Sequence, residues 1–248
     1  MDGMFKVAEL PASRGAAWLA ESFRLFRGAP LAWIGLCAGW MTITLALILV
    51  PLVGGVIANF IQPVFFASFA IAAFKQSAGE PIVMGDLFNG FRRNVRPLIN
   101  LGALLLLFQI AIFALMALLG LPMSTPSDRS ISFAEYLQLF EDKEWILALG
   151  FLLTAVVKGA LWFAPPLIAF HGMSTMHAIR WSIFAALANI GTMLVYGGLL
   201  MVLFILGIIP WALGLLVVIP MMAISTFVGY REVFEGAGAQ APVSTPPK

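Results

Sequence analysis

The sequence predicts an all-α, polytopic helical membrane protein with about six transmembrane helices in three hairpins. Of its 248 residues, 61% are hydrophobic and only 10% are charged, whereas an average soluble domain has roughly 25% charged residues. Several uncharged stretches approach the roughly 20 residues that a helix needs to cross a bilayer core of about 30 Å. So few charged side chains could not cover the apolar surface of a soluble domain, which excludes a soluble enzyme.

Six long apolar stretches, separated by proline, glycine or charged residues, are the predicted spans. They lie near 31–50, 52–74, 98–121, 145–170, 190–209 and 211–228. Pro51 and Pro210 each fall between two adjoining stretches, where a missing backbone donor and nearby glycines place a hairpin turn at the membrane surface. Pro165 and Pro166 interrupt the fourth stretch and predict a kink or a division of that helix.

These spans predict one transmembrane domain, 1–235, and a short C-terminal tail. The tail, 236–248, combines Gly, Pro, Gln and Ser with no apolar periodicity, a composition that predicts disorder. No small-residue cleavage pattern follows the first span, so we expect that span to be retained rather than removed as a signal peptide.

Lys and Arg residues are concentrated on one side of the predicted membrane. The N-terminal segment, the segments before the third and fifth spans and the C-terminal segment together hold 11 of the 14 Lys and Arg residues. The loop between the third and fourth spans holds only Arg129 and Lys143. Because cytoplasmic loops carry the excess of Lys and Arg, both termini are expected in the cytoplasm. The net charge of +2 gives no indication of nucleic-acid binding.

Each segment before an odd-numbered span has the pattern of an amphipathic interfacial helix followed by an elbow. Apolar side chains recur at helical spacing in all three: Leu19, Phe23 and Phe26; Met84, Leu87, Phe88, Phe91 and Val95; Met176, Ile179, Ile183 and Leu187. In the second segment, Asp86, Asn89, Arg92 and Arg93 are expected on the opposite, polar face. The pattern predicts three units, each an interfacial helix plus a hairpin.

Basic side chains next to these apolar stripes are the predicted contacts for anionic phospholipid headgroups. They are Arg24, Arg27, Arg92, Arg93 and Arg96. The third segment has Arg180 as its only charge and a fainter pattern. The expected partners are therefore the bilayer and its anionic lipids, together with a membrane-protein partner that the sequence does not identify.

Lys158 is the one charged residue inside a predicted span. A cation at that depth costs roughly 2.5–3.5 kcal/mol on insertion scales. With Asn59, Gln62 and Gln109 it defines a possible intramembrane polar site. One interpretation is an anion or headgroup contact in an internal cavity. The other, which we favour because the fourth span is long enough to slide, is that the side chain extends to the cytoplasmic interface.

The residues that could serve in catalysis, metal binding or cofactor binding do not form a recognisable site in the sequence. His171 and His177 are six residues apart, so on a continuous helix they would not share a face. Cys37 is the one cysteine and lies in an apolar run. The motifs of hydrolases, zinc proteases and phosphate-binding loops are absent from the sequence. We expect no cofactor, no metal and no enzymatic activity.

Three stretches resemble a family of small six-span bacterial inner-membrane proteins of unassigned function. They are 162–172, with the sequence WFAPPLIAFHG, 23–27, with FRLFR, and 51–54, with PLVG. The resemblance covers most of the chain and implies a six-span topology in the bacterial inner membrane, but it supplies no catalytic residue.

Taken together, these observations favour a non-enzymatic scaffold that organises lipids or partner proteins through its interfacial helices. The alternative is a small transporter or channel for an anionic or amphiphilic solute, using Lys158 and the broken fourth span. An intramembrane enzyme acting on lipid has the least support, because no predicted span contains an acidic residue.

Overall fold

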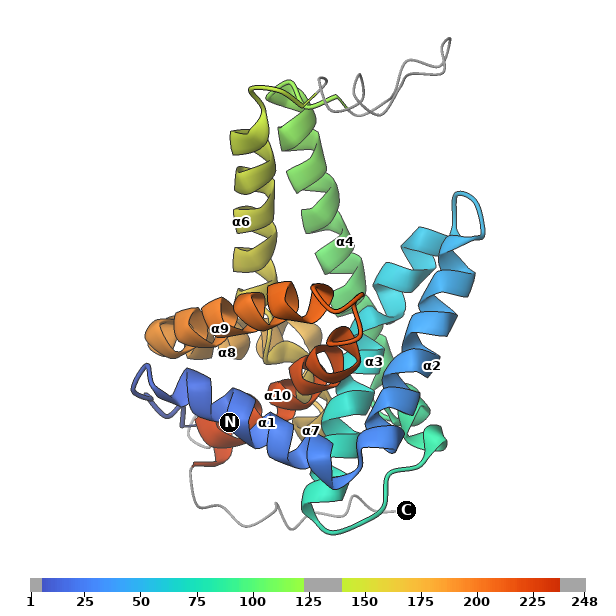
Figure 1. Cartoon of the computed structure of the whole chain (residues 1–248), viewed down its shortest axis with the longest axis vertical. Helices are drawn as coiled ribbons and strands as arrows, with labels where there is room; N and C mark the ends of the chain where they lie inside the picture. The colour runs from blue at the N-terminus through green and yellow to red at the C-terminus, as the bar shows by residue number, and fades with distance from the viewer. Residues whose placement is uncertain (1–5, 123–139, 237–248) are drawn as a thin grey trace.

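The computed structural model describes residues 6–122 and 140–236, and all regular structure in these two ranges is helical (Figure 1). The elements are α1 (Arg14–Gly28), α2 (Pro30–Ile48), α3 (Gly54–Ser77), the 3₁₀ helix η1 (Met84–Arg92), α4 (Val95–Leu118), α6 (Glu144–Ala160), α7 (Ala164–His171), α8 (Thr175–Ala188), α9 (Ile190–Ile208) and α10 (Leu215–Glu235). Six helical segments, with α6 and α7 counted as one, are long and apolar enough to cross a membrane. The predicted fold class is confirmed.

The fourth span is divided, as the two adjacent prolines predict. α6 ends at Ala160 and α7 begins at Ala164. Pro165 and Pro166 lie in the first turn of α7, where a missing backbone N–H removes no intrahelical hydrogen bond. The prolines therefore start a new helix instead of kinking a continuous one.

The last span differs from its predicted bounds of 211–228, because α10 begins at Leu215 and continues to Glu235. Its last two turns contain charged residues that the prediction placed outside the helix. Arg231 forms an ion pair with Glu21 of α1, and Glu232 forms one with Arg14. Because α1 supplies these partners, the helix continues beyond the apolar run. The predicted tail, 236–248, lies outside the described residues except for Gly236.

Three units follow one another along the chain, and each has a helix that precedes a hairpin. Unit one is α1 with α2 and α3, unit two is η1 with α4, α6 and α7, and unit three is α8 with α9 and α10. The first helix of each unit packs mainly on the hairpin of another unit: α1 on α9 and α10, η1 on α2 and α3, and α8 on α4, α6 and α7. The three units therefore interlock in a closed ring, with α3, α7 and α10 in mutual contact at its centre.

The main hydrophobic core lies at one end of the molecule, called the base here and formed by α1, η1, α7, α8, the N-terminal half of α2 and the C-terminal halves of α3 and α10. Its largest fully buried side chains include Trp18, Trp33, Phe65, Phe163 and Tyr230. Both ends of the described chain meet at the base, since the backbone N–H of Ala8 donates to the carbonyl of Val233 at 2.8 Å.

Away from the base the hairpins diverge. In Figure 1, α4 and α6 run along the long axis, while α2 diverges from them and α9 crosses their direction. The turns at the far ends of the hairpins expose large apolar side chains: Leu52 is 98% exposed, Leu118 84% and Trp211 95%. Apolar surface of this extent on a helical protein is matched to the hydrocarbon of a bilayer.

Candidate lipid-headgroup surface and intramembrane polar cavity

Helix α1 presents an apolar face to the core and a basic-aromatic face to the surface. Trp18, Leu19 and Phe26 are buried against the rest of the base. Phe23 points outward and is 40% exposed, and the guanidinium of Arg27 lies over its ring at 5.9 Å. With Arg24, these side chains line an open hollow of about 470 Å³. A cation stacked on an exposed aromatic ring suits the headgroup region of a membrane.

Three of the basic residues counted for the topology form ion pairs with acidic residues of this chain. Lys75 pairs with Asp86 at 3.1 Å, and Arg231 pairs with Glu21. The Nε–H of Arg14 donates to Glu232, and this hydrogen bond raises the pKa of Arg14 above its ordinary value. These three cations hold the helices of the base together. They are therefore not available to a partner in the way that exposed arginines are.

The five arginines predicted to contact headgroups, Arg24, Arg27, Arg92, Arg93 and Arg96, are all exposed. Arg24 has a loose contact with Glu21 at 3.4 Å, and its side chain remains 76% exposed. None of the other four takes part in an ion pair within 6–122 and 140–236. The structure thus separates a set of outward-facing arginines from the cations that hold the base together.

The prediction that Asp86 faces outward is wrong. Asp86 was expected on the polar outer face of the second interfacial helix, but it is only 5% exposed. Its carboxylate accepts hydrogen bonds from Lys75, from the amide of Asn89 at 3.0 Å and from the backbone N–H of Val83 at 2.8 Å. Lys75 on α3 explains why Asp86 faces inward, because the ion pair with this cation holds the Asp86 side of η1 against the protein.

The second interfacial helix is also shorter than predicted. The apolar stripe was expected to run to Val95, but η1 ends at Arg92. Asn94 follows in the left-handed region, with φ of 45°, and Val95 already begins α4. Asparagine adopts this conformation more readily than most residues. The elbow thus comes before Val95 and leaves Arg92, Arg93 and Arg96 on either side of it.

Helix α8, the third of the predicted interfacial helices, is anchored to the break between α6 and α7. The hydroxyl of Ser182 donates to the carbonyl of Ala160 at 2.7 Å and accepts the N–H of Phe163 at 3.1 Å. A backbone donor and acceptor freed by the helix break are thereby satisfied. Ser182 was not among the predicted site residues, although a serine on the inner face of an otherwise apolar stripe is a sign of a buried hydrogen bond.

The two histidines do not lie in one site. His171 ends α7, and its Nε2 is 2.6 Å from the hydroxyl of Tyr230. His177 lies on the exposed side of α8. Within residues 6–122 and 140–236, no group of three or more His, Cys, Asp or Glu side chains is placed so that it could hold a metal ion.

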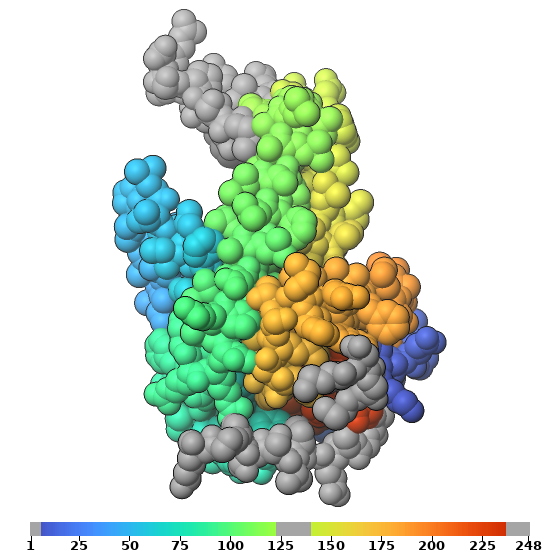
Figure 2. All heavy atoms as spheres, turned by 180° about the vertical axis from the view of Figure 1, so that it is seen from behind, coloured from blue at the N-terminus to red at the C-terminus, as the bar shows by residue number. Residues whose placement is uncertain are grey.

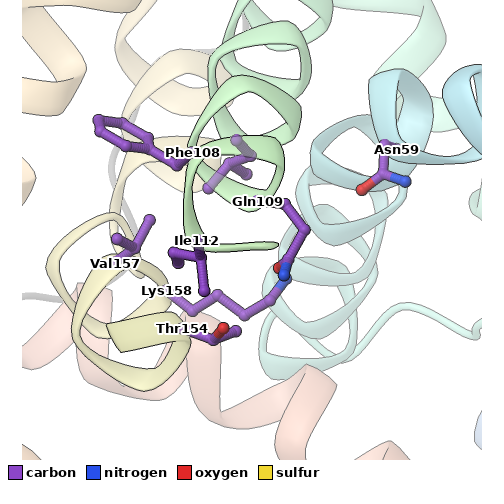
Figure 3. A pocket seen from close by; sticks show the side chains of 8 residues that line it. Asn59, Phe108, Gln109, Ile112, Thr154, Val157 and Lys158 are labelled. Atoms are coloured by element: carbon purple, nitrogen blue, oxygen red, sulfur yellow. The ribbon is translucent and has the colours of Figure 1, made fainter. Parts of the chain in front are cut away.

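Three of the four residues of the predicted polar site line one small cavity between α3, α4 and α6. Figure 3 shows the Lys158 side chain running from α6 toward Gln109 of α4, and Asn59 of α3 lies beyond Gln109. Thr154 adds a further hydroxyl to the lining. The cavity holds about 10 Å³, close to the space that one water molecule needs.

Gln62 does not reach this cavity. It lines a separate open groove of about 140 Å³ between α2 and α3, together with Trp40, Thr44 and Asn59. Asn59 is common to both spaces, and its amide donates to the carbonyl of Gly55 at 2.8 Å. In Figure 2, an open notch separates the α2–α3 hairpin from α4. The four predicted residues are thus neighbours, but they do not surround a single chamber.

Lys158 has no anionic partner among the described residues, since none of the ion pairs there includes it. Its polar neighbours in the cavity are uncharged. A space of this size holds a water or a single polar atom of a ligand, and a larger solute does not fit without a rearrangement of the helices.

Comparison with known proteins supports a location in the bacterial inner membrane. The chain is similar to a probable inner membrane protein of Burkholderia thailandensis, with 28% identity over 207 residues, which cover 77% of this chain and 74% of the relative. No family model and no solved structure matches the chain. The predicted resemblance to bacterial inner-membrane proteins is confirmed, and the six apolar helices identify this chain as an integral membrane protein.

Proposed function

We propose that this protein is a non-enzymatic component of the bacterial inner membrane that organises anionic phospholipids, and proteins associated with them, around its base. The single observation that carries the proposal is the division of its basic residues. Arg14, Lys75 and Arg231 are paired inside the fold, whereas the five arginines of α1, η1 and the start of α4 face outward. Outward cations near the ends of apolar helices are matched to lipid phosphates.

Exposed aromatic rings accompany these arginines. Phe23 lies four residues before Arg27, and Phe88 lies four residues before Arg92, at corresponding places in units one and two; the two rings are 40% and 45% exposed. Phenylalanine is typical of the apolar face of helices that lie in the membrane interface, while arginine binds phosphate oxygens. The repeated Phe–Arg pair supports a role at the membrane surface rather than in contacts with a soluble partner.

We place the base at the cytoplasmic side, with both termini in the cytoplasm. The support is the distribution of Lys and Arg along the sequence. The two terminal segments and the segments before the third and fifth spans hold 11 of them, whereas the loop between the third and fourth spans holds only Arg129 and Lys143. The cytoplasmic leaflet carries the negative surface potential that attracts basic segments. The similarity to a probable inner membrane protein supports the membrane location. The distribution of charges in this chain supports the orientation.

The alternative, a transporter or channel that uses Lys158, has less support. The space beside Lys158 is about 10 Å³, and its polar lining is neutral apart from the lysine itself. A pathway for an anionic or amphiphilic solute would need the α3, α4 and α6 contacts to open. The cavity as it stands is too small for such a pathway.

The proposal is tested by measuring lipid binding to the full-length protein. We would exchange Arg92 and Arg93 for Gln, and compare this variant with one in which Arg129 and Lys143 are exchanged, so that the same charge is removed from the opposite side. Both proteins are placed in nanodiscs that contain phosphatidylglycerol and phosphatidylcholine, and the bound lipids are identified by native mass spectrometry.

At about 1 kcal/mol for each arginine, the Arg92 and Arg93 exchange should weaken retention of phosphatidylglycerol by about 30-fold. The control exchange should leave retention unchanged. Equal retention by the wild-type protein and by a five-arginine variant, in which Arg24, Arg27, Arg92, Arg93 and Arg96 are all exchanged, would contradict the proposal.

A further inference from the structure

The outer face of α8 has no role in the function proposed above, although it combines a cation with several exposed apolar side chains. Its inner face, which includes Ala178, Ile179, Ser182 and Ala185, is buried against the hairpin of unit two. On the outer face, Met176 is 64% exposed, Phe184 57% and Leu187 66%. Figure 2 shows α8, in orange, at the surface of the molecule. The helix is thus buried along one face, while Met176, Phe184 and Leu187 on the other face are exposed.

Four side chains on this face line an open hollow of about 560 Å³: His177, Arg180, Trp181 and Phe184. The rings of Trp181 and Phe184 meet edge to face, with centroids 6.1 Å apart. Arg180 is exposed, and none of the ion pairs in the described ranges uses it. The hollow thus offers a cation, a histidine and an aromatic wall.

The same exposed apolar face continues into the next membrane span. After the elbow at Asn189, Ile190 and Leu194 of α9 are 55% and 68% exposed. A molecule bound at Arg180 would therefore have apolar protein surface extending from α8 toward the hydrocarbon. An anion with hydrocarbon chains fits this arrangement, because its charge meets the guanidinium and its chains meet the apolar residues.

We infer that the α8 hollow is a binding site for one anionic phospholipid, with Arg180 contacting the phosphate and Trp181 and Phe184 packing on the glycerol and upper acyl region. This inference rests on the proposed function and extends it to a discrete site in unit three. The charge of Arg180 argues for a lipid with net negative charge, because a zwitterionic headgroup brings an ammonium beside the guanidinium.

The experiment uses the full-length protein in phosphatidylcholine nanodiscs that are titrated with phosphatidylglycerol. Bound lipids are counted by native mass spectrometry for the wild-type protein, Arg180→Gln, Arg180→Lys and the control Lys143→Gln on the opposite side. A second arm adds millimolar inorganic phosphate, because a free phosphate ion shares the chemistry of the headgroup. Melting temperatures of the same samples report whether each variant is folded.

We expect Arg180→Gln to weaken the binding of one phosphatidylglycerol by about fivefold, Arg180→Lys to restore part of it, and Lys143→Gln and phosphate to have no effect. Unchanged binding by a folded Arg180→Gln protein, or equal binding of phosphatidylcholine, would overturn the inference. Displacement by phosphate would assign the hollow to the free ion instead. If Arg180→Gln binds normally while the five-arginine variant loses lipid, the inference fails and the proposed function stands.

Discussion

Trp18 of α1 donates its indole N–H to the carboxylate of Glu232 on α10 at 2.7 Å, inside the base, where these residues are 0% and 6% exposed. The same carboxylate accepts a hydrogen bond from Arg14. One acidic residue of the last helix thus fixes two residues of the first. This contact closes the ring of three units, because it joins the first unit to the third.

Exchange of Glu232 for Ala should therefore destabilise the protein. The Trp18 indole would lose its acceptor inside the core, at a cost of about 2 kcal/mol, which corresponds to a melting temperature roughly 4–8 °C lower. The measurement is thermal unfolding in detergent, with Glu9→Ala as a control at an exposed position. In a Trp18→Phe background the same exchange should cost clearly less; equal costs in both backgrounds would show that the two residues are not coupled.

The contact between α1 and α9 should depend on Gly15. A Cβ at this position would lie 2.4 Å from the carbonyl oxygen of Thr192 and 2.6 Å from the backbone nitrogen of Tyr196. Gly15→Ala should therefore lower the melting temperature, because backbone atoms have to move apart. Gly197→Ala on α9 is the matched control, since nothing lies within 4 Å of the added Cβ and alanine favours a helix. A Gly15→Ala protein as stable as the control would contradict the observed helix approach.

Lys158→Leu should be tolerated. The exchange removes a cation that costs roughly 2.5–3.5 kcal/mol at the centre of a membrane helix, and Lys158 holds no ion pair among the described residues. We expect the amount of protein in the membrane and the melting temperature to match or exceed those of wild type. The assay also tests complementation in a deletion strain with a phenotype. If a folded Lys158→Leu protein fails to complement the deletion while Lys158→Arg complements it, the result would favour a charge-dependent pathway through α6.

Much of the fold could be predicted from local sequence. Apolar runs of membrane-spanning length predict the six long helices, and Pro51, Pro165 and Pro210 mark turns or breaks, where the missing backbone N–H of proline costs no helix hydrogen bond. Proline alone does not decide this, since Pro63 and Pro220 lie inside α3 and α10. The end of α10 could not be predicted in this way. Arg231 and Glu232 look like the start of a polar tail until their partners on α1 are known, and those partners are more than 200 residues away in the sequence.

The candidate surface could be predicted only in part, for the same reason. The pattern of Phe23, Arg24 and Arg27 already indicates a basic-aromatic face. The face of Asp86 depends on Lys75 of another unit, which no periodicity within η1 reveals. The α8 hollow was missed because Arg180 is a single charge, and a hollow forms only when Trp181 and Phe184 pack together.

The central claim, that the arginine-rich base faces the cytoplasm and the three hairpin tips face the opposite side, is tested most directly by labelling single cysteines. In a Cys37→Ala background, cysteines would replace Ser77 at the base and Leu52, Glu141 and Leu213 at the tips, all of them exposed positions. A membrane-impermeant maleimide added to intact cells that have a permeabilised outer membrane should label the three tip positions and spare Ser77→Cys until the inner membrane is opened. Labelling of Ser77→Cys in intact cells, or protection of Leu213→Cys beside full labelling of Glu141→Cys, would contradict the account.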